Sequence, residues 1–149
     1  MNELNGYDVE DLQPGMSAAF SKTITEADII LFAGASGDNN AIHINEEFAK
    51  TTPFGGRIAH GFLTASTISA AIANRLPGPG TVYISQGMNF LAPVRPGDTV
   101  QATVTVKDIV PERARVTLRT VCTVGDTVVV EGEAIVKVTS AARRLAKAS

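Results

Sequence analysis

Two short segments of this chain, residues 36–43 and 55–62, carry residue types that together could do chemistry next to a carbonyl group. The first holds Asp38 and His43, a carboxylate and an imidazole, which are common choices for a general base and its proton-handling partner. The second leads into a helix start at Gly61, whose backbone N–H would have no acceptor within the helix. Free N–H donors stabilise an oxygen that gains negative charge. The two segments therefore predict an acid–base site with an oxygen-binding donor.

Asp38 and His43 must converge for this chemistry, and a continuous helix would prevent it. Five residues of helix, at about 100° per residue, turn two side chains roughly 140° apart. The neighbouring residues Gly37, Asn39 and Asn40 are turn formers, so we expect both side chains to project from a loop and to orient one water molecule. The alternative is a simple turn in which Asp38 bonds its own backbone and His43 only packs.

Each further candidate also has a structural interpretation. Gly61 could be a glycine that only permits close packing against a sheet. Ser66 could point into the same cavity or bond a carbonyl of its own helix, and for serine alone we favour the second. We interpret His60 as structural. We predict no metal site from Asp38, His43 and His60, because no HxH, HxxxH or paired-cysteine spacing accompanies them.

The elements that must position these residues begin with helices in the first half of the chain. Thr25 and Asp28 favour a helix start, Gly37 favours its end, and a short second helix is predicted for residues 45–50. A third helix, residues 60–75, is apolar or small on every side, and such a helix is normally buried all round. In a small domain, that burial requires a sheet to wrap around the helix.

Strand signals fill the second half of the chain. Its segments alternate apolar and polar residues with a period of two, the pattern of strands with one buried face. Gly125-Asp126 is a two-residue hairpin signal between the last two strands, and the tail from Ser140 is predicted to be frayed or weakly helical. With an early strand included, the predicted strands cover residues 17–24, 82–90, 100–106, 115–124 and 127–138.

Helices followed by strands predict an α+β fold rather than an alternating α/β fold. A curved antiparallel sheet of about five strands wrapped around one central helix describes a hot-dog fold, so we expect a single hot-dog domain over residues 1–149. Sheet edges are a liability for a lone domain. We therefore expect edge-to-edge pairing into a homodimer or a higher homo-oligomer.

Composition narrows the class of function. Hydrophobic residues make up 44% of the chain, which suits a packed globule, and the formal charge of -2 offers no basic surface for nucleic acid. The N-terminus lacks the pattern of a secretory signal and no apolar stretch is long enough to span a bilayer, so we expect no membrane association and a cytoplasmic location. Cys122 is the single cysteine, and we expect it to be a buried strand residue.

Taken together, the two segments resemble the MaoC-like dehydratase family, whose hydratase 2 motif has the form S/G-x-D-x-N-P-x-H. Asp38, Asn40 and His43 stand at the Asp, Asn and His positions of that motif. Ala41 stands where the family usually has proline, which loosens the turn but removes no functional group. The similarity covers nearly the whole chain and continues through residues 59–66, Tyr83, Phe90, Pro93-Val94 and Gly97-Asp98.

This resemblance implies an (R)-specific enoyl-CoA hydratase of fatty acid metabolism, which adds water reversibly and syn across a trans-2-enoyl thioester and needs no cofactor. It implies that Asp38 is the base that activates the water, that His43 orients the water and helps to deliver a proton to the α carbon, and that the Gly61 N–H binds the thioester oxygen. Asn40 and Ser66 are implied as substrate-binding or supporting residues. The implied partner is an acyl-CoA.

Two other functions fit the same residues. A hot-dog acyl-CoA thioesterase also uses a carboxylate and a helix-start N–H, and it would release free CoA. A non-catalytic acyl-thioester binding domain would keep the groove but would not need a base aimed at water, so Asp38 and His43 favour an enzyme. Arg57, Arg75 and Arg95 are candidates for contacts with CoA phosphates or a carrier protein.

Overall fold

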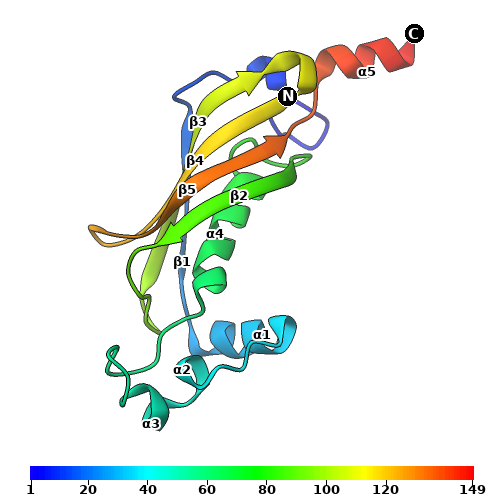
Figure 1. Cartoon of the computed structure of the whole chain (residues 1–149). Helices are drawn as coiled ribbons and strands as arrows, with labels where there is room; N and C mark the ends of the chain where they lie inside the picture. Colours follow the sequence, from blue (N-terminus) through cyan, green and yellow to red (C-terminus); the bar gives the residue numbers. More distant parts are fainter.

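A five-stranded antiparallel sheet, with the strand order β1-β3-β4-β5-β2, dominates the computed structural model, which describes residues 1–149. The sheet curves along one side of the helix α4 (Gly61–Asn74), as Figure 1 shows. This arrangement confirms the predicted α+β class and the hot-dog architecture. The strands are β1 (Ser17–Thr23), β2 (Val82–Phe90), β3 (Thr99–Val110), β4 (Arg115–Val124) and β5 (Thr127–Lys137).

The shorter helices lie at opposite ends of the sheet (Figure 1). Three of them cluster beyond the end of the sheet where α4 begins, whereas α5 projects from the other end. The tail forms a regular helix capped by the Ser140 side chain, which is more order than the sequence predicts. None of the helices has the length and apolar character needed to cross a membrane. The helices are α1 (Glu26–Ser36), α2 (Ala41–Ile44), α3 (Glu46–Ala49) and α5 (Ala141–Ala148), with 3-10 turns at Val9–Asp11 and Pro111–Arg113.

Local sequence signals explain where α1 and the last hairpin begin and end. The Thr25 hydroxyl accepts the N–H of Asp28, while the Asp28 carboxylate accepts the N–H of Thr25, so the predicted helix start is a full capping box. Gly37 ends α1 in the left-handed conformation, with φ of 79°, which glycine adopts without strain. The β4–β5 hairpin turns at Gly125, as the sequence predicts.

One cluster of 24 buried hydrophobic residues forms the core between α4 and the sheet. Helix α4 packs against β1, β3 and β4, and it contributes Leu63, Ile68 and Ile72. Cys122 on β4 is fully buried in this cluster, which confirms its predicted place in a strand. Burial raises the pKa of the Cys122 thiol, so the thiolate needed for reactivity is disfavoured.

Two burial predictions are wrong for the single chain. The first is that the apolar face of β2 is buried: Val82, Ile84 and Phe90 are exposed, because α4 packs mainly against β1, β3 and β4 and leaves the face of β2 largely uncovered. The second is that α4 is buried all round. The sheet covers only the side of α4 that faces β1, β3 and β4, so Phe62 is 65% exposed and Ser66 is also exposed.

Candidate active site

The loop after α1 presents the carboxylate of Asp38. The Ser36 hydroxyl accepts the N–H of Asp38 at 3.1 Å, and Asp38 Oδ1 accepts the N–H of Asn40 at 3.2 Å. These local bonds make the predicted turn and occupy one carboxylate oxygen. The Asp38 side chain is 49% exposed, and its Oδ2 lies 3.9 Å from Nε2 of His43. Asp38 therefore makes the predicted backbone contact and also faces the imidazole.

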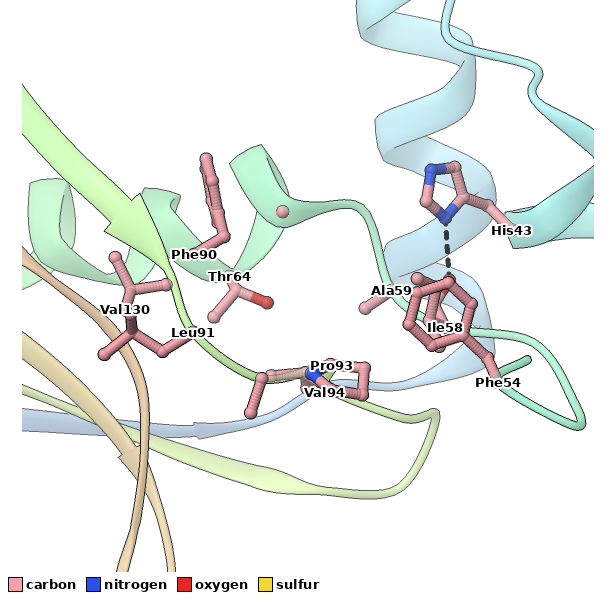
Figure 2. Close-up of a pocket in the computed structure, with 12 residues that line it drawn as sticks. His43, Phe54, Ile58, Ala59, Thr64, Phe90, Leu91, Pro93, Val94 and Val130 are labelled. Atoms are coloured by element: carbon pink, nitrogen blue, oxygen red, sulfur yellow. Dashed lines mark hydrogen bonds between the residues drawn. The ribbon is translucent and has the colours of Figure 1, made fainter. Parts of the chain in front are cut away.

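His43 comes from the short helix α2, which corrects the prediction that both residues project from a loop. The Asn40 side chain accepts the N–H of Ile42 and so starts α2 right after the Asp38 turn, which brings the His43 ring back towards Asp38. His43 Nδ1 lies 2.8 Å from the carbonyl oxygen of Ile58 (Figure 2). A carbonyl can only accept, so Nδ1 donates and the neutral ring keeps its lone pair on Nε2.

The pair Asp38 Oδ2 and His43 Nε2 presents two proton acceptors at one point. Acceptors 3.9 Å apart can both receive hydrogen bonds from a single water molecule, since each bond spans about 2.8 Å. Such a water would point its two protons at the protein and its oxygen lone pairs away from it. That arrangement suits attack by the water on a bound electrophile.

Gly61 opens α4, and its N–H has no hydrogen-bond acceptor within the protein. The N–H groups of Phe62 and Leu63 in the same turn also lack acceptors, as expected at a helix start, and they add to the positive end of the helix dipole. The ring of Phe90 from β2 lies against Gly61, and a Cβ here would be 2.7 Å from Phe90 Cε1. Both interpretations of Gly61 thus have support: the site offers a free donor, and it also leaves no room for a side chain.

His60, immediately before Gly61, is 1% exposed and contacts both Asp38 and His43. Its Nε2 lies 3.0 Å from the carbonyl oxygen of Asp38, so Nε2–H donates to that carbonyl. The His60 ring stacks on the His43 ring with a centroid distance of 4.0 Å, and Phe32 packs against it at 4.8 Å. The other ring nitrogen, Nδ1, has no hydrogen-bond partner.

Asn40 and Ser66, the predicted supporting residues, use their polar groups locally. Asn40 caps α2 through its side-chain oxygen. The Ser66 hydroxyl donates to the carbonyl oxygen of Leu63 at 2.5 Å, which is the bond back to its own helix favoured by the sequence. Ser66 nevertheless lines a cavity together with Asp38 and Gly61.

Two cavities meet at Gly61. One, of about 330 Å³, is mainly apolar and includes His43; Figure 2 shows His43 and Phe54 on one side of it and Phe90 and Thr64 on the other. The second, of about 620 Å³, includes Asp38 and reaches β2. A ligand that spans both cavities would pass the Gly61 N–H and the Asp38–His43 pair. Tyr83 from β2 lines the second cavity, and burial raises the pKa of Tyr83 to about 12, so its hydroxyl stays protonated.

Arg57 fastens the three small helices together and is not a free cation. Its guanidinium donates to Glu26 of α1 at 2.9 Å and to Glu46 of α3 at 3.2 Å, and it also reaches the carbonyl oxygen of His43 at 3.4 Å. The hydrogen bond and charge of Glu26 raise the pKa of Arg57. Arg95 donates to the carbonyl oxygen of Phe54, a residue of the first cavity.

Asp38, His43 and His60 are the residues that could hold a metal ion, because their ligand atoms all lie within 4.8 Å of one another. The ring geometry opposes this use. A metal ion binds along the nitrogen lone pair, in the plane of each imidazole. The His43 and His60 rings stack with an interplanar angle of 30°, so one ion cannot lie in both ring planes without rotation of a buried ring.

Several residues of the site escape sequence reasoning because they come from distant parts of the chain. Phe54, Phe90 and Val130 line the first cavity, and only Phe90 carries a sequence signal, through the family pattern. The Ile58 carbonyl that fixes the His43 ring has no side-chain signature at all. Gly55 and Gly56, shortly before His60, indicate only that the backbone turns there.

Comparison with known proteins identifies the family that this sequence matches. Residues 11–131 match the family described as "MaoC like domain". The chain is 58% identical over 129 residues to the (R)-specific enoyl-CoA hydratase of Rhodospirillum rubrum, covering 87% of this chain and 90% of that protein. It is 53% identical over 136 residues to the 3-hydroxybutyryl-CoA dehydratase of Methylorubrum extorquens, covering 91% of this chain and 87% of the relative.

Among solved structures, the unliganded R-hydratase PhaJ1 from Pseudomonas aeruginosa matches with a TM-score of 0.85 and 39% identity. That match covers 91% of this chain and 87% of the other chain.

Proposed function

We propose that this chain is an (R)-specific enoyl-CoA hydratase. The chain belongs to the MaoC-like domain family, and this membership is the premise of the proposal. It adds water reversibly to a trans-2-enoyl-CoA and forms the (R)-3-hydroxyacyl-CoA. The names of the relatives support both the reaction and its stereochemistry. The observation in the structure that carries the proposal is the Asp38 Oδ2–His43 Nε2 pair, 3.9 Å apart, beside the free N–H of Gly61.

Asp38 and His43 hold the attacking water between them. Asp38 Oδ2 takes a proton from the water as its oxygen attacks the β carbon, and His43 Nε2 orients the same water by accepting its second O–H. The α carbon must gain one proton for each hydroxyl that adds to the β carbon. His43 Nε2 carries no proton in this tautomer, so the proton that Asp38 takes from the water is the one delivered to the α carbon. Because the hydroxyl and this proton both come from the Asp38–His43 side of the bound substrate, the addition is syn.

Gly61 supplies the electrophilic half of the mechanism. Attack at the β carbon moves negative charge onto the thioester oxygen, which becomes an enolate. The N–H of Gly61, at the positive end of α4, is free to donate to that oxygen. The donor gains strength as the charge develops, so it stabilises the transition state more than the bound substrate.

We also propose that residues 1–149 form one domain that works as a homodimer paired along β2. A single core supports the one-domain proposal, and the unpaired outer edge of β2 supports the dimer. Val82 and Ile84 are exposed on this strand, and Tyr83 and Met88 line the cavity of Asp38. A second copy across this edge would shield apolar side chains and would also close the open side of the site.

The test is hydration of crotonyl-CoA, followed by loss of the enoyl absorbance, with the chirality of the product and any free CoA measured at the end. We expect (R)-3-hydroxybutyryl-CoA and no free CoA. Asp38→Asn and His43→Ala should each lower kcat by about 100- to 10,000-fold, the usual contribution of a general acid–base group. Release of CoA would favour a thioesterase, and no turnover of short, medium or branched enoyl-CoAs would favour a binding domain.

A further inference from the structure

We propose that His60 is a positioning residue that sets the distance between the base Asp38 and the oxygen-binding N–H of Gly61. The proposal rests on the proposed hydratase function. It goes beyond that function by giving a role to a buried imidazole that the reaction itself does not use.

The loop of Asp38 needs an anchor because its other contacts are local. Asp38 is bonded through its N–H to Ser36 and through Oδ1 to the N–H of Asn40, each two residues away in the chain. Bonds of this kind shape a turn but do not fix where the turn lies relative to α4. The bond from His60 Nε2 to the Asp38 carbonyl joins residues 22 apart in the sequence. It is the long-range hydrogen bond of this loop.

The anchor and the oxygen-binding donor are neighbours in the chain. His60 is the N-cap of α4, and Gly61 is its first residue. A displacement of the α4 start therefore moves the His60 ring and the Gly61 N–H together, and the bond to the Asp38 carbonyl carries the base with them. The same ring stacks on His43, so one side chain contacts both members of the acid–base pair.

The structure requires one tautomer of His60. Its Nδ1 is buried without a partner, and the Asp38 carbonyl can only accept, so the proton of the neutral ring lies on Nε2. His43 must be the opposite tautomer, because its Nδ1 donates to Ile58. If the His60 ring only filled space in the core, either nitrogen could carry the proton.

The first test is spectroscopic and uses the unmodified chain. Because the protein contains two histidines, a long-range proton–nitrogen correlation spectrum contains only two imidazole patterns, and His60→Gln assigns them. We expect the Nε2–H tautomer for His60 and the Nδ1–H tautomer for His43 at neutral pH. A His60 ring without a proton on Nε2 overturns the proposal.

The second test separates the donor from the ring. The amide nitrogen of glutamine can take the place of Nε2, whereas phenylalanine keeps a flat ring but cannot donate. We expect His60→Phe to lower kcat about 100-fold, the loss caused by a misplacement of about 1 Å. KM should change by less than about threefold, because the lost positioning acts on the transition state. His60→Gln should recover most of the lost kcat.

Thr67→Val is the matched control. Thr67 is buried on the same helix and donates to the carbonyl oxygen of Thr64, away from the Asp38 loop. It should lower the unfolding temperature without lowering kcat. Equal losses of kcat in His60→Phe and His60→Gln, or no loss in His60→Phe, overturn the positioning role. A parent chain with no hydratase activity overturns the proposed function instead, and the spectrum then decides on the hydrogen bond alone.

Discussion

At the scale of single residues, the site depends on which polar groups are left without a partner. Asp38 Oδ2 and His43 Nε2 face each other without a direct hydrogen bond, and the Gly61 N–H has no acceptor. Each of these groups would be strongly solvated in water or paired in an ordinary core. All three groups lie at the two cavities that meet at Gly61, so a bound ligand and water can supply the hydrogen bonds that the protein leaves open.

Gly61→Ala should impair the site through Phe90. The new Cβ would lie 2.7 Å from Phe90 Cε1, so the ring must move, and this ring lines the first cavity. We expect kcat/KM to fall about tenfold, which corresponds to about 1.4 kcal/mol of activation free energy. The double variant Gly61→Ala, Phe90→Leu should recover most of the activity, because the N–H remains. An equally impaired double variant would mean that the helix start itself had shifted.

Residue types and spacing are enough to predict Asp38, His43 and Gly61 as a group, because turn formers and a helix start have local causes. They do not predict how the rings are oriented. The carbonyl that fixes His43 lies 15 residues away, and the one that holds His60 lies 22 residues away. Backbone carbonyls are present at every residue, so no sequence pattern can single these two out.

At the scale of elements, the principal difference from the sequence prediction is α2. Residues 41–44 form a helical turn because Asn40 caps it, although four residues are too few for a reliable periodic signal. This turn carries His43 into the protein, so the ring is buried while Asp38 stays half exposed. The sequence also does not predict the edge position of β2. Alternation of apolar and polar residues shows that a strand has an apolar face, but not whether another element covers that face.

Ala41→Pro should stabilise the protein. Ala41 is the first residue of α2, its N–H makes no hydrogen bond, and Asn40 before it has φ of -57° and ψ of 129°, which suits a residue that precedes proline. We expect the free energy of unfolding in urea to rise by about 0.4–1 kcal/mol, because proline restricts the unfolded chain. The hydratase activity should stay close to that of the parent.

Ala35→Pro is the control for that substitution, because residue 35 lies inside α1. It should destabilise the protein by about 3 kcal/mol, as proline does in a helix interior. If Ala41→Pro also destabilised, the first turn of α2 could not have the capped geometry described above.

At the scale of the whole molecule, the two ends of the chain are joined by a charged contact. Asp8 is buried, and Arg144 of α5 donates to both of its carboxylate oxygens at 2.6 and 2.7 Å. Glu10 accepts the hydroxyl of Ser140 and the first N–H groups of α5. The hydrogen bonds from Arg144 hold the pKa of Asp8 far below its usual range.

Because of this contact, the free energy of unfolding should decrease as the pH falls into the acid range. Ionised Asp8 favours the folded state at any pH above its unfolded pKa, near 4, and that contribution is lost as the pH falls towards its lower folded pKa. Asp8→Asn should therefore lower the free energy of unfolding at pH 7 and flatten its decline below about pH 5. Urea unfolding at a series of pH values measures the free energy of unfolding at pH 7 and its decline in acid. Arg144→Ala should have the same effect, and parallel curves for Asp8→Asn and the parent would contradict the role of the pair.

The last prediction concerns β2 as the edge between two copies. Ile84→Lys places a charge among the exposed apolar residues of that strand, so it should shift a dimer to monomers in sedimentation experiments. Leu145→Lys is the matched control, because Leu145 is 72% exposed on α5, which contacts Asp8 and Glu10 near the N-terminus, and should leave the dimer intact. The monomeric variant should also show a raised KM, because β2 forms a wall of the cavity that holds Asp38. A monomeric parent would rule out the proposed dimer, and dissociation caused by Leu145→Lys alone would place the interface at α5 instead of β2.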